Sequence, residues 1–353
     1  MYRPLKSSVI IPLYNKAAYI ARALRSVVAQ DCQEYEVLVI DDGSTDNGPD
    51  IVRRWLSDPR IQLISQKNSG EGAARNRGLA EMRGDLAAFL DADDEWLPTH
   101  LHDLAEIATT YPAAGLLATG FRAVHGGGLA FDHGIDRRSP AVISNYFSLA
   151  TTGHTVHVSA CGVTKSLLAQ GVRFKQNAPI GADQEFYARA AVHSPLAYHP
   201  RISSLYHRDV AGSVMANTRW SDDLPLTAES LSQMLREHVV PSSLTESASS
   251  YLAWIIEQHA LAGVAVGKKA EVLSLLRQAH RHPIPDRSKR RFDQLKAVIQ
   301  STPLPLLRMA LRFRTSRWRI AVGKLPSIQV GPEASSAPVR ATTRASLRSL
   351  VSR

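Results

Sequence analysis

Three carboxylates follow the apolar run at 86–90, in the order Asp91, Asp93 and Asp94. Like charges this close repel one another unless a positive group lies between them. A hard divalent cation together with phosphate oxygens is the usual partner of such a cluster. The alternative is a helix cap, in which Asp93 or Asp94 opens a helix at Trp96, although one aspartate suffices for that. The segment therefore favours a metal and phosphate site.

Two further polar segments could bind a nucleotide. In the segment 41–46, the carboxylate of Asp42 could accept a hydrogen bond from uracil N3–H or from a ribose hydroxyl. A plain turn is the alternative, because Asp, Gly and Ser are turn formers. In 68–78, small residues between Asn68 and Arg75 let a helix start approach a ligand closely. A solvated helix start is equally consistent with that segment.

Strand and helix patterns alternate through the first ninety residues and must position these polar segments. The predicted strands are 7–13, 36–40, 61–65 and 86–90, and the predicted helices between them are 17–30, 46–56 and 71–83. This alternation predicts a parallel sheet with helices on its faces. Ligands bind at the carboxyl ends of such strands, which is where all three polar segments fall.

The remaining chain gives weaker patterns. Residues 155–163 could form a strand, and 183–193 could form a helix with Asp183 as its N-cap. The region 222–300 is mostly helical by its apolar spacing. Beyond residue 326 the chain is rich in Ser, Ala, Pro and Arg, which predicts disorder.

Composition excludes several classes of protein. With 44% hydrophobic and 21% charged residues, the chain is neither fully disordered nor fibrous. The two cysteines, Cys32 and Cys161, are too few for a disulfide scaffold or a cysteine-rich zinc site. We find neither an apolar signal-peptide core nor an uncharged apolar run of 18 residues. These features lead us to expect a cytoplasmic location.

The net charge of +10 is concentrated at the C-terminus, because residues 281–353 hold 16 Lys/Arg and only 3 Asp/Glu. Within the segment 304–322, a helical wheel puts apolar residues on one side (Leu306, Met309, Phe313, Ile320) and arginines on another (Arg308, Arg312, Arg319). Such a helix could lie on an anionic bilayer, and a solvated basic tail is the alternative. We expect no nucleic-acid partner, because the basic residues lie outside the folded body and lack interleaved aromatics.

Four segments together resemble a known family. The motifs at 8–15, 41–46, 68–78 and 89–94 have the order and spacing of family 2 glycosyltransferases of GT-A fold. The resemblance covers about residues 6–215 and implies a catalytic domain at 1–215, with nucleotide-sugar binding at 1–100 and the acceptor side at 101–215. For the rest of the chain, apolar spacing, charge and composition predict a helical region at 220–300, a basic amphipathic segment at 301–325 and a disordered tail at 326–353. The expected fold class is therefore α/β, a GT-A (Rossmann-like), mostly parallel sheet flanked by helices, followed by a C-terminal helical region and a basic tail.

The resemblance also implies nucleotide contacts. Pro12 and Tyr14 match positions that pack on the base. Asp42 matches the carboxylate that binds uracil N3, and Asn68 and Arg75 match base and ribose contacts. A UDP-sugar is therefore the expected donor.

The same resemblance assigns the chemistry. Asp91 and Asp93 match the DxD motif, with Asp91 also near the nucleotide and Asp93 the direct ligand of Mn²⁺ or Mg²⁺. Asp183 matches the catalytic base and Glu185 is retained, whereas Ala182 replaces the family's first acidic residue. The implied mechanism is an inverting single displacement, in which the base takes the proton of an acceptor hydroxyl.

The expected acceptor is a carbohydrate or a lipid-linked saccharide of bacterial surface polysaccharide or glycolipid synthesis. Contact with an anionic membrane through 304–322 would place the chain on the inner face of the cytoplasmic membrane. The absence of the family's first acidic residue, replaced here by Ala182, leaves open a second hypothesis, a non-catalytic nucleotide-sugar-binding protein on the same fold. The sequence indicates neither the sugar, the linkage nor the oligomeric state.

A few single residues have two interpretations. Trp96 could stack on a sugar or belong to the core. His207 or Arg208 could touch phosphate or lie in a surface loop. For His154 and His157, packing or acceptor lining is favoured over zinc binding, because no third partner is near them in the sequence.

Overall fold

A computed structural model describes residues 5–125, 130–153, 156–176, 178, 181–208, 210 and 220–311. These residues divide into two units. One unit holds the described residues up to 210 together with 226–252, and the other holds 220–225 and 253–311. The helical region expected at 220–300 is therefore shared between them. His154 and residues 312–353 lie outside the described part.

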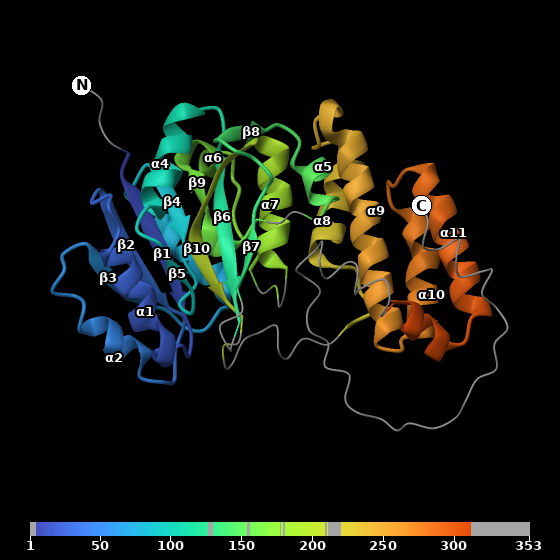
Figure 1. Ribbon diagram of the computed structural model, residues 1–353, viewed down its shortest axis with the longest axis horizontal. Helices are drawn as coiled ribbons and strands as arrows, with labels where there is room; N and C mark the ends of the chain where they lie inside the picture. Colours follow the sequence, from blue (N-terminus) through green and yellow to red (C-terminus); the bar gives the residue numbers. More distant parts are fainter. Residues whose placement is uncertain are drawn as a thin grey trace. The chain divides into compact units, whose positions relative to one another are not determined.

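A large sheet forms the centre of the first unit (Figure 1). Its described strands are β1 (Ser7–Leu13), β2 (Tyr35–Asp41), β3 (Ile61–Ser65), β4 (Leu86–Phe89), β5 (Glu95–Trp96), β6 (Leu116–Val124), β7 (Ala130–His133), β8 (Ala141–Ile143), β9 (Cys161–Thr164) and β10 (Leu196–His207). The strand order is β3-β2-β1-β4-β9-β6-β10-β5, with β7 on β6 and β8 on β10. Strands β1 to β4 pair in parallel, as do β6 and β10, while β5, β7, β8 and β9 run antiparallel to their partners.

Helices cover both faces of this sheet. In the first unit they are α1 (Ala17–Val28), α2 (Gly48–Arg53), α3 (Glu71–Glu81), α4 (His100–Thr110), α5 (Tyr146–Ala150), α6 (Lys165–Ala169), α7 (Ala182–His193) and α8 (Leu226–Arg236). Side chains of α1 and α4 share one core with alternate residues of β1 and β2. On the opposite face α3 packs on β1, where a Cβ at Gly78 would lie 2.5 Å from Ile10 Cγ2. The predicted fold class is confirmed by this arrangement.

The four N-terminal strands form where the sequence predicts them. β1, β2 and β4 are short and almost entirely buried, whereas β3, at the edge of the sheet, is only partly buried. Every residue of β2 and β4 is buried, which is what a parallel strand covered on both faces requires. The helix predicted at 46–56 is shorter, Gly48–Arg53. The side chain of Asp46 accepts hydrogen bonds from Gly48 N (2.9 Å) and from Ala17 N (2.8 Å), so this residue closes a turn instead of starting the helix.

Two later predictions are wrong in detail. The strand predicted at 155–163 is instead a 3-10 turn, η2 (Val158–Ala160), followed by β9, because the ring of His157 accepts from Ser159 N and closes the turn. The predicted N-cap Asp183 lies inside the first turn of α7. The cap is Gly181, whose φ of 78° lies in the left-handed region that glycine tolerates.

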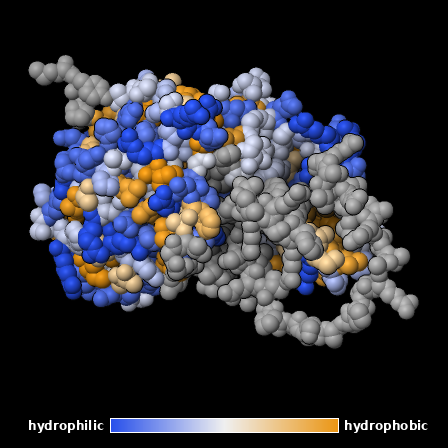
Figure 2. Space-filling model, viewed as in Figure 1, coloured by the Kyte–Doolittle hydropathy of each residue, from blue (hydrophilic) through white to orange (hydrophobic). Residues whose placement is uncertain are grey.

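The second unit is helical. It contains the later part of α9 (Ser242–Ala265), then α10 (Lys269–Gln278), α11 (Asp286–Ser301) and a helical stretch at 304–311. Its buried apolar residues include Val272, Leu276, Phe292 and Ile299. Within the described part of the chain, no helix combines the length and apolarity needed to cross a membrane. Hydrophilic residues cover most of the face drawn in Figure 2, with apolar ones in separate patches.

Candidate active site

The loop after β4 is anchored by its third aspartate. Asp94 is 1% exposed, and its carboxylate accepts from His207 N at 3.0 Å and from the hydroxyl of Ser159 at 2.5 Å. That hydroxyl oxygen in turn accepts from Asp91 N at 3.1 Å. Burial, with the neighbouring carboxylates, raises the pKa of Asp94 well above its usual range. Asp94 therefore ties the loop to η2 and to the end of β10.

The helix-cap alternative for this segment is wrong, because α4 begins at His100 with Thr99 before it. Trp96 is a core residue: it is 2% exposed, its Nε1 donates to Ser159 O at 2.6 Å, and its ring lies 4.3 Å from that of His100. A stacking contact between Trp96 and a sugar is thereby excluded.

Arg75 lies buried beneath the first aspartate of the loop. It is 2% exposed, its guanidinium donates to Asp91 at 2.7 Å and to Glu71, and it lies 5.2 Å from the centre of the Phe174 ring. Burial alone lowers the pKa of Arg75, but the two carboxylates raise it above its ordinary value. Burial raises the pKa of Asp91 to about 7 against the effect of Arg75. The predicted base or ribose contact of Arg75 stays a prediction.

Asp93 is paired with a lysine from the loop after β1. The ammonium group of Lys16 lies 2.6 Å from Asp93 Oδ2, and the two side chains are 17% and 20% exposed. Arg22 donates to the backbone oxygen of Asp93. The sequence motif gave no indication of either partner.

The donor set suits a hard divalent cation. The Asp91 and Asp93 side chains are each 20% exposed, so carboxylate oxygen remains accessible on both. Asp91, Asp94 and His157 also place one ligand atom each within 4.8 Å of one another. The carboxylate of Asp94 is however already engaged by two donors, and His157 Nδ1 accepts from Ser159 N at 3.2 Å. Asp91 and Asp93 are therefore the better candidates to hold Mn²⁺ or Mg²⁺.

Asp42 anchors the start of α3. It is 3% exposed, and its carboxylate accepts from Gln66 Nε2 (2.8 Å), Ser69 N (2.9 Å) and Gly70 N (2.8 Å). Since a carboxylate offers about four acceptor positions, one remains on Oδ2. Asn68 is exposed on the same loop. The prediction that Asp42 binds uracil N3 is untested by these contacts.

The ends of β1 and β2 are joined by Asn15, the last residue of the motif at 8–15, to which the sequence assigned no role. Asn15 has a φ of 51°, and its side-chain oxygen accepts from Thr45 N at 2.8 Å and Asp46 N at 3.3 Å. This junction holds Tyr14 at the strand end with 48% exposure. Pro12 is half-buried within β1. Asn or Asp in the left-handed region directly after a strand is the signal that could have identified this role.

The two acidic residues at the start of α7 differ in their burial and in the hydrogen bonds that they accept. Glu185 is fully buried, accepts from the Ser230 hydroxyl at 2.7 Å and pairs with Arg189. Asp183 is half-buried, and the only hydrogen bond recorded for its side chain among the described residues is from Gln184 N at 2.8 Å. Glu185 therefore holds α7 against α8, whereas Asp183 keeps acceptor capacity. The role of Asp183 as base is a prediction that these contacts leave untested.

The end of β10 lies beside the DxD loop. Besides the backbone bond to Asp94, the ring of His207 lies 3.4 Å from Glu95 Oε2, and burial lowers the pKa of His207. The Arg208 backbone N donates to Val124 O at 3.0 Å. His207 therefore lies next to the carboxylates, and Arg208 follows it at the end of β6; a contact of either with diphosphate stays a prediction.

The fold and the polar residues at the ends of β1, β2 and β4 define a GT-A type α/β protein. The crystal structure of S. aureus TarS 1–349 in complex with UDP-GlcNAc superposes with a TM-score of 0.70 at 20% identity, covering 89% of this chain and 92% of that one. The mannosyltransferase PcManGT from Pyrobaculum calidifontis, in complex with GDP-Man and Mn²⁺, gives a TM-score of 0.50 at 19% identity, covering 90% and 81%. At these identities the likeness establishes the fold.

The family follows from sequence. Residues 8–170 match the family model described as Glycosyl transferase family 2. Over 115 residues the chain is 42% identical to the uncharacterized glycosyltransferase alr2836 of Nostoc sp., covering 32% of this chain and 36% of that protein. Residues 8–170 thus match glycosyltransferase family 2, as the resemblance implied. The match spans about a third of the relative's own length.

Proposed function

We propose that this chain is an inverting glycosyltransferase that moves a sugar from a nucleoside diphosphate to a hydroxyl group of an acceptor saccharide. One observation carries the proposal: Asp91 and Asp93 keep accessible carboxylates in a loop that Asp94 and Arg75 hold in place. A loop fixed from beneath by buried partners presents its two accessible carboxylates in one arrangement, as binding a cation and a diphosphate requires.

The donor we propose is a UDP-sugar. TarS was solved with UDP-GlcNAc and PcManGT with GDP-Man, so this fold accepts more than one base. The remaining acceptor position on Asp42 Oδ2 matches uracil N3–H, which is a single donor. Tyr14, which is 48% exposed at the end of β1, offers a ring against which the base packs.

Asp91 and Asp93 would hold Mn²⁺ or Mg²⁺. Bound there, the cation supplies neutralisation of charge on the departing diphosphate. Lys16 and Arg22 bring positive charge to the same loop, and His207 at the end of β10 donates its backbone N–H to Asp94. The charges of Lys16 and Arg22 favour the negative charge that develops on the leaving group.

Asp183 is the base we propose. A general base needs a carboxylate that reaches an acceptor hydroxyl, and of the acidic pair on α7 only Asp183 is accessible. It accepts the hydroxyl proton as that oxygen attacks C1 of the sugar and the bond to the diphosphate breaks. Glu185, which is buried and already bonded to Ser230, serves to position the helix.

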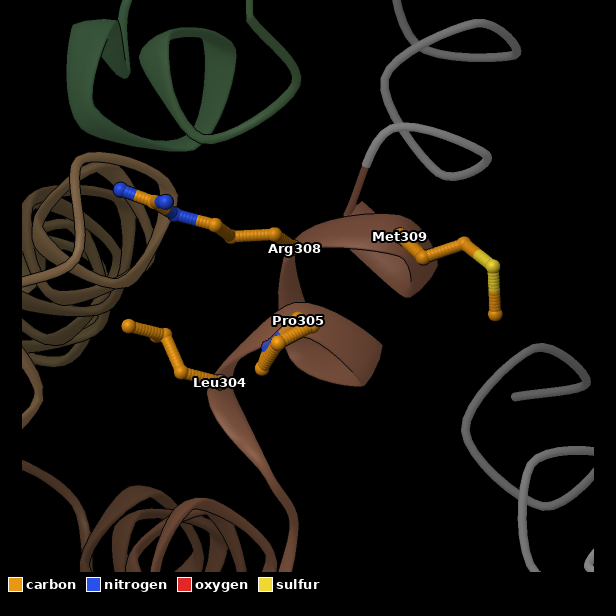
Figure 3. A pocket seen from close by; sticks show the side chains of 4 residues that line it. All are labelled: Leu304, Pro305, Arg308 and Met309. Atoms are coloured by element: carbon orange, nitrogen blue, oxygen red, sulfur yellow. The ribbon is translucent and has the colours of Figure 1, made fainter. Parts of the chain in front are cut away.

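We further propose that the acceptor belongs to a bacterial surface polysaccharide or glycolipid, reached by peripheral contact of 304–322 with an anionic membrane. In the described part of this segment, 304–311, a Cβ at Gly267 would lie 2.7 Å from Arg308 Nη2 and 3.6 Å from Leu304 Cδ2, and Met309 is 46% exposed. Figure 3 shows the side chains of Leu304 and Arg308 extending to one side and that of Met309 to the other. A hollow of about 270 Å³ is lined by Leu304, Pro305, Arg308 and Met309. Cosedimentation with vesicles containing phosphatidylglycerol tests the contact, and equal binding by a chain truncated after residue 303 would contradict it.

The experiment for the main proposal is a calorimetric titration with UDP, with and without Mn²⁺. We expect metal-dependent binding that is lost in Asp93→Ala. Asp183→Asn should keep the UDP affinity and lose hydrolysis or transfer of a UDP-sugar. Binding without turnover in the wild-type protein would instead favour the non-catalytic hypothesis. Absence of UDP binding with metal present would overturn the uracil assignment.

A further inference from the structure

A row of aromatic and imidazole rings runs along one face of the sheet beside the DxD loop. We name it the aromatic row; its members are Tyr206, His157, Phe121, His133, Phe131 and His125. Phe121 and His133 are stacked with ring centres 5.0 Å apart, and Phe121 lies 5.2 Å from His157. His157 lies 4.2 Å from Tyr206. The row therefore joins three strands and the loop before η2.

Strand register explains why these rings share a face. In β6 and β7, Phe121 is paired with His133 and Ala123 with Phe131. In β6 and β10, Ala123 is paired with Tyr206. Directly paired residues, and residues two apart on a strand, project from the same face of a sheet. The arrangement thus follows from backbone pairing rather than from the placement of single side chains.

The inner end of the row touches the proposed donor site. His157 Nδ1 lies 3.8 Å from Asp94 Oδ2, and the residue after Tyr206 donates its backbone N–H to the same carboxylate. Asp94 in turn fixes the loop that carries Asp91 and Asp93. Phe121 is 1% exposed and His157 is 7% exposed, so this end is buried.

The outer end of the row faces solvent. Phe131 is 55% exposed, and the ring of His125 meets its edge at 5.8 Å. Among the described residues, β7 pairs with β6 alone, so Phe131 lies at the margin of the sheet. A single exposed phenylalanine is ordinary. This one shares a sheet face with the inner rings through strand register, since Phe131 is paired with Ala123 and Ala123 with Tyr206.

We propose that Phe131 and His125 form the binding platform for the acceptor, which is a saccharide; this inference rests on the proposed transferase function. The apolar C–H face of a pyranose packs on an aromatic ring, while its hydroxyls need polar partners at the ring edge. Phe131 supplies the ring for the apolar face, and the imidazoles of His125 and His133 supply polar partners for the hydroxyls. The pairing of β6 with β7 and β10 sets the position of this platform relative to the buried rings, of which His157 lies 3.8 Å from Asp94.

A glycan array printed with bacterial polysaccharide fragments tests the proposal, using the full-length protein loaded with UDP and Mn²⁺. We compare the wild type with Phe131→Ala and Phe131→Trp. The control is Leu56→Ala, which removes another exposed apolar side chain, in the turn after α2. We expect Phe131→Ala to weaken saccharide binding about tenfold. Phe131→Trp should retain binding, and the control should equal the wild type.

The UDP affinity of each variant is measured in parallel and separates the two proposals. Because Phe131 is exposed, its truncation should leave the fold and UDP binding unchanged. Saccharide binding that is unaffected in Phe131→Ala would overturn the platform, as would a wild-type protein that binds UDP but no saccharide on the array. Failure to bind UDP would instead contradict the proposed function.

Discussion

The pairing of Lys16 with Asp93 leads to a quantitative prediction about metal binding. A lysine ammonium group and a divalent cation compete for the same carboxylate, so removing Lys16 should strengthen binding of Mn²⁺. The two charged atoms lie 2.6 Å apart, and both side chains are less than a quarter exposed. A cation that binds Asp93 must first break this ion pair.

The size of the effect follows from the geometry. At an effective dielectric constant of about 20, opposite unit charges at this separation attract by about 6 kcal/mol before desolvation is counted. Desolvation and side-chain ordering cancel most of that attraction, which leaves about 1 kcal/mol for a partly exposed pair. Lys16→Met should therefore tighten Mn²⁺ binding about fivefold.

The assay is a titration of the protein with Mn²⁺ alone, followed by the electron paramagnetic resonance signal of free Mn²⁺. The matched control is Lys67→Met, which removes the same charge from an exposed position in the loop before α3. We expect tighter binding in Lys16→Met, wild-type binding in the control and no site in Asp93→Ala. Unchanged or weaker Mn²⁺ binding in Lys16→Met would refute the competition.

Three further predictions concern stability. Gly78→Val should destabilise the fold by about 1–3 kcal/mol, because its Cβ would lie 2.5 Å from Ile10 Cγ2; urea unfolding would show this, and wild-type stability would contradict the tight packing of α3. Ser230→Ala should cost about 1–2 kcal/mol, since it removes a donor from buried Glu185; no loss in urea unfolding would mean that this bond is dispensable. Burial lowers the pKa of His100 to about 3, so below about pH 6 its imidazole binds a proton in the unfolded state but stays neutral in the folded state. The free energy of unfolding should therefore fall by about 1 kcal/mol for each pH unit below about 6. An equal dependence on pH in His100→Asn would contradict this.

The N-terminal half of the fold was predictable because its signals are local. Each of β1, β2 and β4 is a short, mostly apolar run that is buried in the sheet, as a parallel strand covered on both faces requires. The helix boundaries were less predictable, because they depend on side-chain bonds across the chain. Asp46 ends a turn by binding Ala17 N, a residue 29 positions earlier, and no local pattern reports that contact.

The resemblance to the DxD motif singled out Asp91 and Asp93, but the role of Asp94 was not predictable. Taken alone, Asp91, Asp93 and Asp94 are three carboxylates at the end of one strand. The partners that distinguish Asp94 are Ser159 and His207, which lie 65 and 113 positions away. Only the folded sheet brings them together, so the motif locates the site and its two accessible acids but does not show that Asp94 anchors the loop.

The same reasoning bears on Ala182, the departure that motivates a non-catalytic hypothesis. The acidic segment of α7 has two tasks, to present an accessible carboxylate and to hold the helix. Asp183 is accessible, and the helix is held by Glu185 through Ser230 and Arg189. Both tasks are therefore met with alanine at position 182, and the contacts of Glu185 do not depend on an acidic side chain there. The substitution is therefore weak grounds for expecting binding without turnover, and loss of turnover in Asp183→Asn is the measurement that decides between the two.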